Sequence, residues 1–146
     1  MKIRIRDLQK KDMGRILGYR EETACISFPG MKMDMGKCRE SMLLQVRRYP
    51  GTIKVAEAGG RLVGYISFGP RKGSLGAHGR INIIFVEERY RKHGIGELLL
   101  EEAEKWFRSH GISRIDAVVT NTNSRSMDFF RERGYREKRT VFEKRL

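Results

Sequence analysis

The sequence has little of what marks disulfide-rich, zinc-binding or membrane proteins. Among its 146 residues are two cysteines, three prolines and one tryptophan. Cys25 and Cys38 form no metal-ligand spacing and the histidines are scattered, so we expect reduced thiols and no metal. The apolar run at 83–86 is far shorter than the roughly 20 residues that a membrane-spanning helix needs. The N-terminus lacks the apolar block of a signal peptide, so we expect a cytoplasmic protein without a membrane partner.

Acidic residues are also scarce. The chain has 18 Asp and Glu against 31 Lys and Arg, a formal net charge of +13. Most of the excess lies in residues 1–11, 70–80 and 131–146, which carry net charges of +4, +3 and +4, whereas residues 81–130 carry −1. A basic excess is compatible with a nucleic-acid or ribosome partner. The distribution confines that excess to the two ends of the chain and one loop.

The first half of the chain alternates between strand and helix patterns. Ile3 and Ile5 alternate with basic residues, which is typical of a half-buried strand. Asp12 is a candidate N-cap for a first helix that runs through Tyr19. A loop is expected at 25–36, a second helix at 37–48, and strands at 53–57 and 62–68 that are joined by a Gly-Gly hairpin.

The second half continues the alternation. Four glycines predict a flexible loop at 69–79, and a nearly continuous apolar run predicts a buried strand at 81–86. A helix with one apolar face opens at Gly94 and ends before Gly111. The remaining elements expected are a strand at 114–120, a helix at 124–133 and a closing strand at 135–144. The length fits a single domain over residues 1–146, with the order β-α-α-β-β-β-α-β-α-β.

The turn between the buried strand and this helix has the chemistry of an anion site. A helix N-terminus leaves about four backbone N–H groups without intrahelical partners, and no Ser, Thr, Asp or Asn stands at the start of this one. Gly94 and Gly96 remove side chains that would keep an anion from the backbone. A phosphate or pyrophosphate is therefore the expected ligand, although a glycine-rich turn of this kind is also found for geometric reasons alone.

Two well-known phosphate loops do not fit. A P-loop requires Lys and then Ser or Thr after its last glycine, but Glu97 follows Gly96. The dinucleotide-binding fingerprint requires three glycines after the strand that opens the domain, and this turn meets neither condition.

The turn instead resembles a motif of a known family. The segment from Val86 to Gly96, with Tyr90 before an R-x-x-G-x-G turn, resembles the acetyl-CoA-binding motif of GNAT superfamily N-acetyltransferases. Asn123-x-x-Ser126-x-x-Phe129-Phe130-x-x-x-Gly134-Tyr135 is similar to the family's second cofactor motif. The order of elements matches across essentially the whole chain. The resemblance implies an α/β GNAT-like domain, with a mixed, mostly antiparallel sheet flanked by helices, and acetyl-CoA as cosubstrate.

The resemblance also implies roles for individual residues. The backbone of the strand at 84–86 would pair with the pantetheine arm like an added strand, between the strands at 81–86 and 114–120. A main-chain N–H near Val86 would stabilise the oxyanion formed when an amine attacks the thioester. The residues implied to bind the cofactor are Ile84, Phe85, Val86, Arg91, Lys92, His93, Gly94, Ile95, Gly96, Glu97, Asn123 and Ser126.

The resemblance does not supply an acid or a base. Relatives with a side-chain base on the fourth strand carry it at positions that here hold Asn82 and Arg80. The alternative position for a base, on the fifth strand, holds Val118. Phe130 stands where the family usually has a Tyr that acts as the general acid. Of these residues, we assign a candidate catalytic role only to Asn82, as the holder of a water molecule, beside the backbone of Val86.

Three explanations for the missing base stay open. The chain binds CoA without catalysis, or a water held by Asn82 relays the proton to solvent, Glu87 or Glu88. Otherwise the acceptor is a weakly basic amine: with a pKa near 8, about a tenth of it is neutral at pH 7, so positioning alone suffices. We favour the last explanation. Glu87 and Glu88 are expected to be solvated charges at the end of a strand.

Further expectations concern the segment at 25–35, the aromatic residues of the second motif and His93. Residues 25–35 are expected to shape the acceptor pocket, as in relatives, or their methionines contribute to an adaptable core. Phe129, Phe130 and Tyr135 are expected in the core, and His93 is expected to face solvent.

The leading hypothesis is transfer of an acetyl group to a primary amine (a protein N-terminus, a lysine or a small amine) in a ternary complex. The alternative is a basic CoA-binding, nucleic-acid-binding or ribosome-associated module with little catalytic activity. Aromatic residues are not interleaved with the basic ones as a stacking platform would require. The acceptor is not specified by the sequence, and a homodimer is left open.

Overall fold

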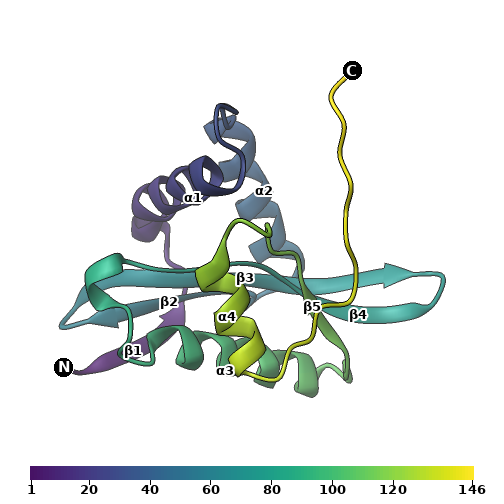
Figure 1. The fold of residues 1–146 in the computed structure, drawn as a ribbon. Helices are drawn as coiled ribbons and strands as arrows, with labels where there is room; N and C mark the ends of the chain where they lie inside the picture. Colours follow the sequence, from purple (N-terminus) through teal and green to yellow (C-terminus); the bar gives the residue numbers. More distant parts are fainter.

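Alternating apolar side chains build a five-stranded sheet with helices on both faces (Figure 1). The computed structural model describes all 146 residues. Its elements are β1 (Ile3–Asp7), η1 (Lys10–Asp12), α1 (Met13–Ser27), α2 (Met35–Arg48), β2 (Ile53–Ala58), β3 (Arg61–Gly73), β4 (Gly76–Val86), η2 (Glu88–Tyr90), α3 (Ile95–Ser109), β5 (Ile115–Ala117) and α4 (Ser124–Glu132). The strands lie in the order β1-β2-β3-β4-β5. All neighbours are antiparallel except β4 and β5, which are parallel. The mixed α/β fold is the one that the sequence predicts.

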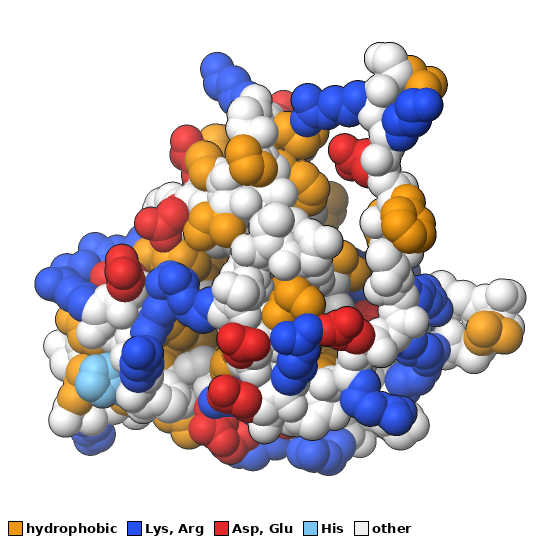
Figure 2. Space-filling model, in the orientation of Figure 1, with side chains coloured by type: hydrophobic (Ala, Val, Ile, Leu, Met, Phe, Trp, Pro, Cys, Tyr) orange, Lys and Arg blue, Asp and Glu red, His pale blue; other side chains and the backbone are white.

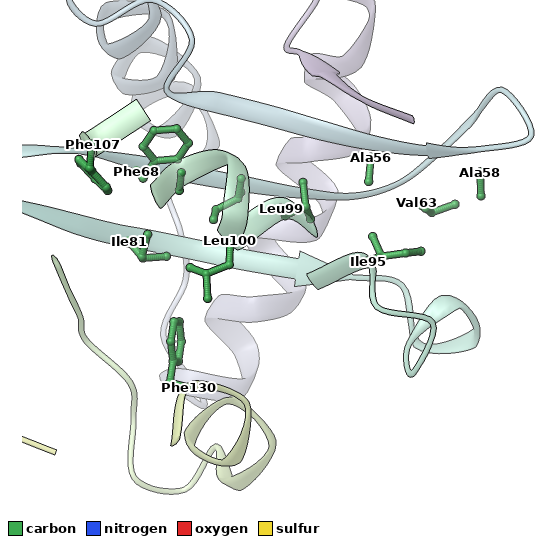
Figure 3. Close-up of a cluster of buried hydrophobic side chains, with 12 residues drawn as sticks. Ala56, Ala58, Val63, Phe68, Ile81, Ile95, Leu99, Leu100, Phe107 and Phe130 are labelled. Atoms are coloured by element: carbon green, nitrogen blue, oxygen red, sulfur yellow. The ribbon is translucent and has the colours of Figure 1, made fainter. Parts of the chain in front are cut away.

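Each face of the sheet carries its own core. On one face, α3 packs its apolar stripe against β2, β3 and β4, and Phe130 of α4 joins the same cluster (Figure 3). On the other face, α1 and α2 cover a second cluster that contains Tyr19, Tyr65 and Phe85. Phe129 and Tyr135 pack against the first cluster and Phe130 is part of it, so their expected core positions are confirmed. The sheet thus lies between two apolar layers, and β4 contributes buried side chains to both.

The expected loop at 69–79 is wrong, because those residues extend β3 and β4 into one long hairpin. Its tip is the pair Gly73↔Gly76, and Gly76 has a left-handed φ of +96°. Gly79 serves close packing: a Cβ there would lie 2.7 Å from the ring of Phe107. The sequence does not distinguish a glycine that makes room for a neighbouring ring from a glycine in a flexible loop. For this reason the glycines at 69–79 predict a loop.

Two features at the N-terminal side also differ from expectation. Helix α1 runs through Ser27, so the expected loop that begins at Cys25 starts later. Asp12 precedes α1 but makes no capping bond to it. Its carboxylate instead accepts hydrogen bonds from the Arg6 guanidinium at 2.7 Å and from the Gln9 N–H at 2.7 Å. Because its carboxylate is occupied by Arg6 of β1 and by the Gln9 N–H, Asp12 does not cap α1.

The C-terminal segment departs most from the sequence-based expectation. The strand expected at 114–120 shortens to Ile115–Ala117, and the closing strand expected at 135–144 is absent. The chain beyond Tyr135 instead runs away from the sheet (Figure 1). Val141 is 86% exposed and Phe142 is 94% exposed. Alternation predicts a strand only where another strand supplies hydrogen bonds, and this segment has none. No helix in the structure is long and apolar enough to span a membrane.

Candidate active site

A β-bulge lies in the middle of β4. The pairing of β3 with β4 passes from Ser67↔Ile83 directly to Phe68↔Ile81, so Asn82 is the extra residue. Bulges bend a strand and redirect a side chain. The Asn82 Oδ1 atom accepts a hydrogen bond from Arg71 at 3.0 Å, and its Nδ2 atom donates to Ser67 Oγ at 3.4 Å. The candidate catalytic Asn82 is therefore fixed by β3.

The two parallel strands separate at the same level. Pairing of β4 with β5 ends at Ile81↔Ala117, so the rest of β4 has no partner on this side. The Glu87 N–H donates to the Val63 carbonyl of β3 at 2.8 Å. Because backbone groups alternate in an antiparallel pair, Ile84 and Val86 direct theirs to the open edge. The separation of the two strands that we expected is confirmed.

A cavity of about 470 Å³ occupies this opening. It extends from β4 and β5 to α1 and to the segment that links α1 with α2, and α4 closes its other side. The residues that line it are Arg20, Thr23, Ala24, Ser27, Phe28, Met31, Lys32, Met33, Ile81, Asn82, Ile83, Ile84, Ala117, Val118, Val119, Thr120, Asn123, Ser126 and Phe130. In this view the C-terminal segment stands beside the helices above the sheet, with open space between (Figure 2).

The turn after β4 leads to an uncapped helix. Gly94 is the N-cap of α3, and no side chain caps the helix. Lys92 and Gly94 have left-handed φ values of +64° and +76°. The first N–H groups of α3 therefore point out of a helix end that carries about half a positive charge. The absence of a side-chain cap agrees with the sequence-based expectation.

The two glycines of this turn have different functions. No atom lies within 4 Å of the position that a Cβ on Gly94 would take, so the space in front of the backbone is open. A Cβ on Gly96, in contrast, would lie 3.2 Å from the Phe129 ring. Gly96 therefore allows α4 to pack closely on α3, a reason different from the access for an anion that we expected.

Two basic side chains, Arg91 and Arg125, lie near this turn. Burial and then the nearby charge of Arg125 lower the pKa of Arg91. The Arg91 Nε atom donates to the Val86 carbonyl at 2.7 Å, which ties the turn to the end of β4 and leaves the Val86 N–H for another acceptor. His93 is exposed, as expected. Glu97 is exposed and 3.5 Å from Arg133.

Two of the expected cofactor residues form one local structure. The Asn123 Oδ1 atom accepts the Ser126 N–H at 3.3 Å and so caps α4. Both residues also line the cavity. The cap holds the side-chain oxygen of Asn123 in place and leaves the amide NH₂ group free to donate a hydrogen bond.

The positions that the resemblance assigns to an acid or a base have other surroundings in the structure. Arg80 is bound to Asp116 at 2.8 Å. Val118 is 73% exposed and lines the cavity, as does Phe130, which is nearly buried. The lining contains no Asp, Glu, His, Tyr or Cys. The cavity is therefore lined by no carboxylate or imidazole that could take a proton from an amine.

The expectation that Glu87 is a solvated charge is wrong. Its carboxylate accepts the Tyr19 O–H at 2.6 Å and an N–H of Arg61 at 3.1 Å. Burial on its own would raise the pKa of Glu87, but the hydrogen bonds from Tyr19 and Arg61 outweigh it and lower that pKa. A carboxylate held in this way is a poor proton acceptor, and it does not line the cavity. Glu88 is exposed, as expected.

The residues that sequence reasoning missed lie on the α1 side of the cavity. Arg20 and Thr23 of α1 line it, although the sequence shows no signal that marks them as site residues. Of the segment at 25–35, Phe28 and Met31 line the cavity and are exposed, which favours pocket shaping over an adaptable core. The packing of α1 beside the open end of β4 depends on tertiary structure, and no local sequence pattern indicates it.

Comparison with known proteins identifies the family. The acetyltransferase (GNAT) family matches residues 17–135. YxbD of Bacillus subtilis (strain 168), described as uncharacterized, is 39% identical over 54 residues, which span 37% of this chain and 34% of that relative. The chain therefore matches about a third of the length of this curated relative.

Solved structures share the fold over nearly the whole chain. The aminoglycoside N-acetyltransferase AAC(6')-Iy, bound to the bisubstrate analogue CoA-S-monomethyl-acetylneamine, has a TM-score of 0.77 at 18% identity and covers 100% of this chain and 99% of its own. Naa50 of Arabidopsis thaliana, bound to the bisubstrate analogue CoA-Ac-MVNAL, has a TM-score of 0.72 at 18% identity, covering 97% and 87%. The motifs, the open edge of β4 and the family match over residues 17–135 agree, and the chain belongs to the acetyltransferase (GNAT) family.

Proposed function

We propose that this protein transfers the acetyl group of acetyl-CoA directly to a primary amine in a ternary complex. The observation that carries the proposal is the cavity at the separation of β4 and β5. It joins an open strand edge, suited to an amide-containing arm, to a pocket beneath α1. Related structures hold CoA-linked analogues of an aminoglycoside and of a peptide, so the shared fold serves unlike acceptors.

The residues around the opening fit acetyl-CoA. Ile84 and Val86 offer backbone groups for the pantetheine amides, and the helix end at residues 91–97 offers N–H groups for the pyrophosphate. Asn123 and Ser126 stand on the far wall of the cavity. We assign the Val86 N–H to the thioester oxygen as it becomes negative. The cosubstrate supplies an activated acetyl group, and the protein supplies position and hydrogen bonds.

The absence of a base in the cavity lining determines the mechanism that we propose. The amine reaches the thioester already deprotonated, and proximity provides the rate enhancement. Asn82 orients the amine or a water. As the C–N bond forms, the C–S bond breaks and CoA leaves as its thiolate, and the proton of the amine leaves to solvent. Below the pKa of the acceptor amine, kcat/KM for the acceptor should rise about tenfold per pH unit, in proportion to the neutral amine. A plateau set by a protein group near pH 6–7 would instead require a base.

Blocking the opening tests the site. Val118 lines the cavity and is largely exposed, so Val118→Trp should fill the opening without disturbing the core. We expect it to weaken acetyl-CoA binding by more than about tenfold, the equivalent of some 1.4 kcal/mol, in calorimetry. Leu75→Trp is the matched control, because Leu75 is 91% exposed and outside the cavity lining. Failure of the unmodified protein to bind micromolar acetyl-CoA would overturn the proposal.

A further inference from the structure

The acceptor side of the cavity has an unusual charge pattern. Its lining contains 19 residues, and the only ionisable side chains among them are Arg20 and Lys32. Arg20 comes from α1, and Lys32 comes from the segment between α1 and α2. No carboxylate lines the cavity. Any molecule that enters from this side therefore meets two cations and no anion.

These two cations are not neutralised by the protein. Neither Arg20 nor Lys32 takes part in an ion pair within 4.0 Å, although many other cations of the chain do. Burial raises the pKa of the Tyr65 hydroxyl beneath α1, and the charge of Arg20 opposes that shift. Arg20 itself lines the cavity.

No acidic side chain lines this end of the cavity, and Asp34, two residues after Lys32, is exposed. Asp116 is held by Arg80 at 2.8 Å and by His78 at 3.1 Å. Glu21 and Glu22, which follow Arg20 on α1, are exposed and do not line the cavity. A third cation, Arg71, donates to the Asn82 amide oxygen at the floor. The ionisable side chains that line this end of the cavity are therefore both cations.

From this arrangement, and resting on the proposed acetyl transfer, we infer that the acceptor is a primary amine that also carries a carboxylate. Arg20 and Lys32 bind the carboxylate, while the amine reaches the opening between β4 and β5. Amines with a second positive charge are rejected by the same side chains, because two like charges in a partly enclosed site repel each other. Selection by charge also explains how a site without an acidic residue can accept an amine: the acceptor is held by its anion.

A set of three amines of the same length tests the inference. The set is 5-aminopentanoate, pentylamine and 1,5-diaminopentane, which differ in the charge at the far end. CoA release should be fastest with the acid, and kcat/KM should fall by roughly tenfold from the acid to the neutral amine and further to the diamine, as expected for two partly exposed charge contacts. In calorimetry with the CoA-bound protein, 5-aminopentanoate should bind more tightly than pentylamine.

Substitutions assign the effect to the two cations. Lys32→Glu and Arg20→Gln should raise KM for 5-aminopentanoate by about threefold to tenfold and leave KM for acetyl-CoA unchanged. Arg39→Glu is the matched control, because Arg39 is exposed on α2 and outside the cavity lining. Comparing free glutamate with peptides that begin with Glu or with Lys then distinguishes a small acceptor from a protein N-terminus.

The outcomes separate the two proposals. Equal rates for the three amines, or a preference for the diamine, would overturn the inference. A rise of KM for acetyl-CoA in Lys32→Glu and Arg20→Gln would also overturn it, because the two cations would then serve the phosphates of CoA. Binding of acetyl-CoA without transfer to any carboxylate-bearing amine would refute it too. Loss of acetyl-CoA binding in the unmodified protein would refute the proposed function itself.

Discussion

At the scale of single residues, glycines at close contacts are as informative as charged side chains. Gly64, Gly79 and Gly96 each stand where a Cβ would meet a neighbouring backbone or ring. At Gly64 the Cβ would lie 2.6 Å from the Phe85 carbonyl oxygen. The close contacts of β3 with β4, of β4 with α3 and of α3 with α4 therefore depend on the absence of a side chain at these three glycines.

The contact at Gly79 predicts a loss of stability. Gly79→Ala places a methyl group against the Phe107 ring in the larger core and should lower the free energy of unfolding by about 1–3 kcal/mol. Gly69→Ala is the control, since Gly69 is buried in the paired strand β3 and its Cβ would meet no atom within 4 Å. Urea denaturation of the two variants measures the difference. Equal midpoints would show that the ring moves aside freely.

A second residue-scale prediction concerns acid sensitivity. Burial on its own would raise the pKa of Asp12, but hydrogen bonds from Arg6 and the Gln9 N–H outweigh it and lower that pKa. Because the pKa in the folded state lies below the unfolded value of about 3.9, the carboxylate stabilises the protein above that pH. The stabilisation is lost as the pH falls through the folded-state pKa.

Asp12→Asn should therefore reduce stability at neutral pH and flatten the fall in stability below about pH 4. Denaturation midpoints at several pH values measure both effects. Asp128→Asn is the control, because the Asp128 side chain is 67% exposed. A variant at Asp12 whose pH dependence equals that of the unmodified protein would contradict the assignment.

At the scale of elements, the C-terminal segment differs from every other predicted strand. Val141, Phe142 and Leu146 are almost fully exposed, so the segment buries little apolar area. Its sequence carries the same alternation that correctly predicts β1. The difference is that β1 pairs with β2 over five residues, whereas the segment beyond Tyr135 pairs with no strand.

Removal of residues 138–146 should consequently change the free energy of unfolding by less than about 0.5 kcal/mol, as for exposed side chains generally. The shortened chain keeps Glu137 and its ion pair with Arg131. Thermal unfolding followed by circular dichroism is the measurement. A drop in Tm of several degrees would show that this segment packs against the sheet.

At the scale of the whole molecule, the basic excess is partly consumed within the fold. Arg6 is paired with Asp12 and Glu57, and Arg80 is paired with Asp116. The cofactor side of the chain has almost no net charge, while two unpaired cations face the acceptor side of the cavity. The charge that first suggested nucleic acid therefore relates in part to the fold and in part to the proposed acceptor.

Binding of acetyl-CoA should stabilise the whole molecule, because the open edge of β4 and the cavity exist only in the folded state. At a ligand concentration 100 times Kd, the gain is about 2.7 kcal/mol. For a domain of this size that corresponds to a rise in Tm of roughly 5–11 °C. Differential scanning calorimetry with increasing acetyl-CoA measures it, and Val118→Trp should show a smaller rise at the same concentration.

The sequence by itself determined the order of most elements, the two cofactor motifs, and the residues at the positions implied for a base (Asn82, Arg80 and Val118) and for an acid (Phe130). Local periodicity and a local motif carry this information. The tertiary structure decided what depends on distant residues. It showed the bulge at Asn82 and the end of β4–β5 pairing, and it converted a predicted loop into a hairpin. It also placed Arg20 of α1 and Lys32 of the following segment at the same cavity as Asn82 of β4, which depends on how α1 packs against the sheet.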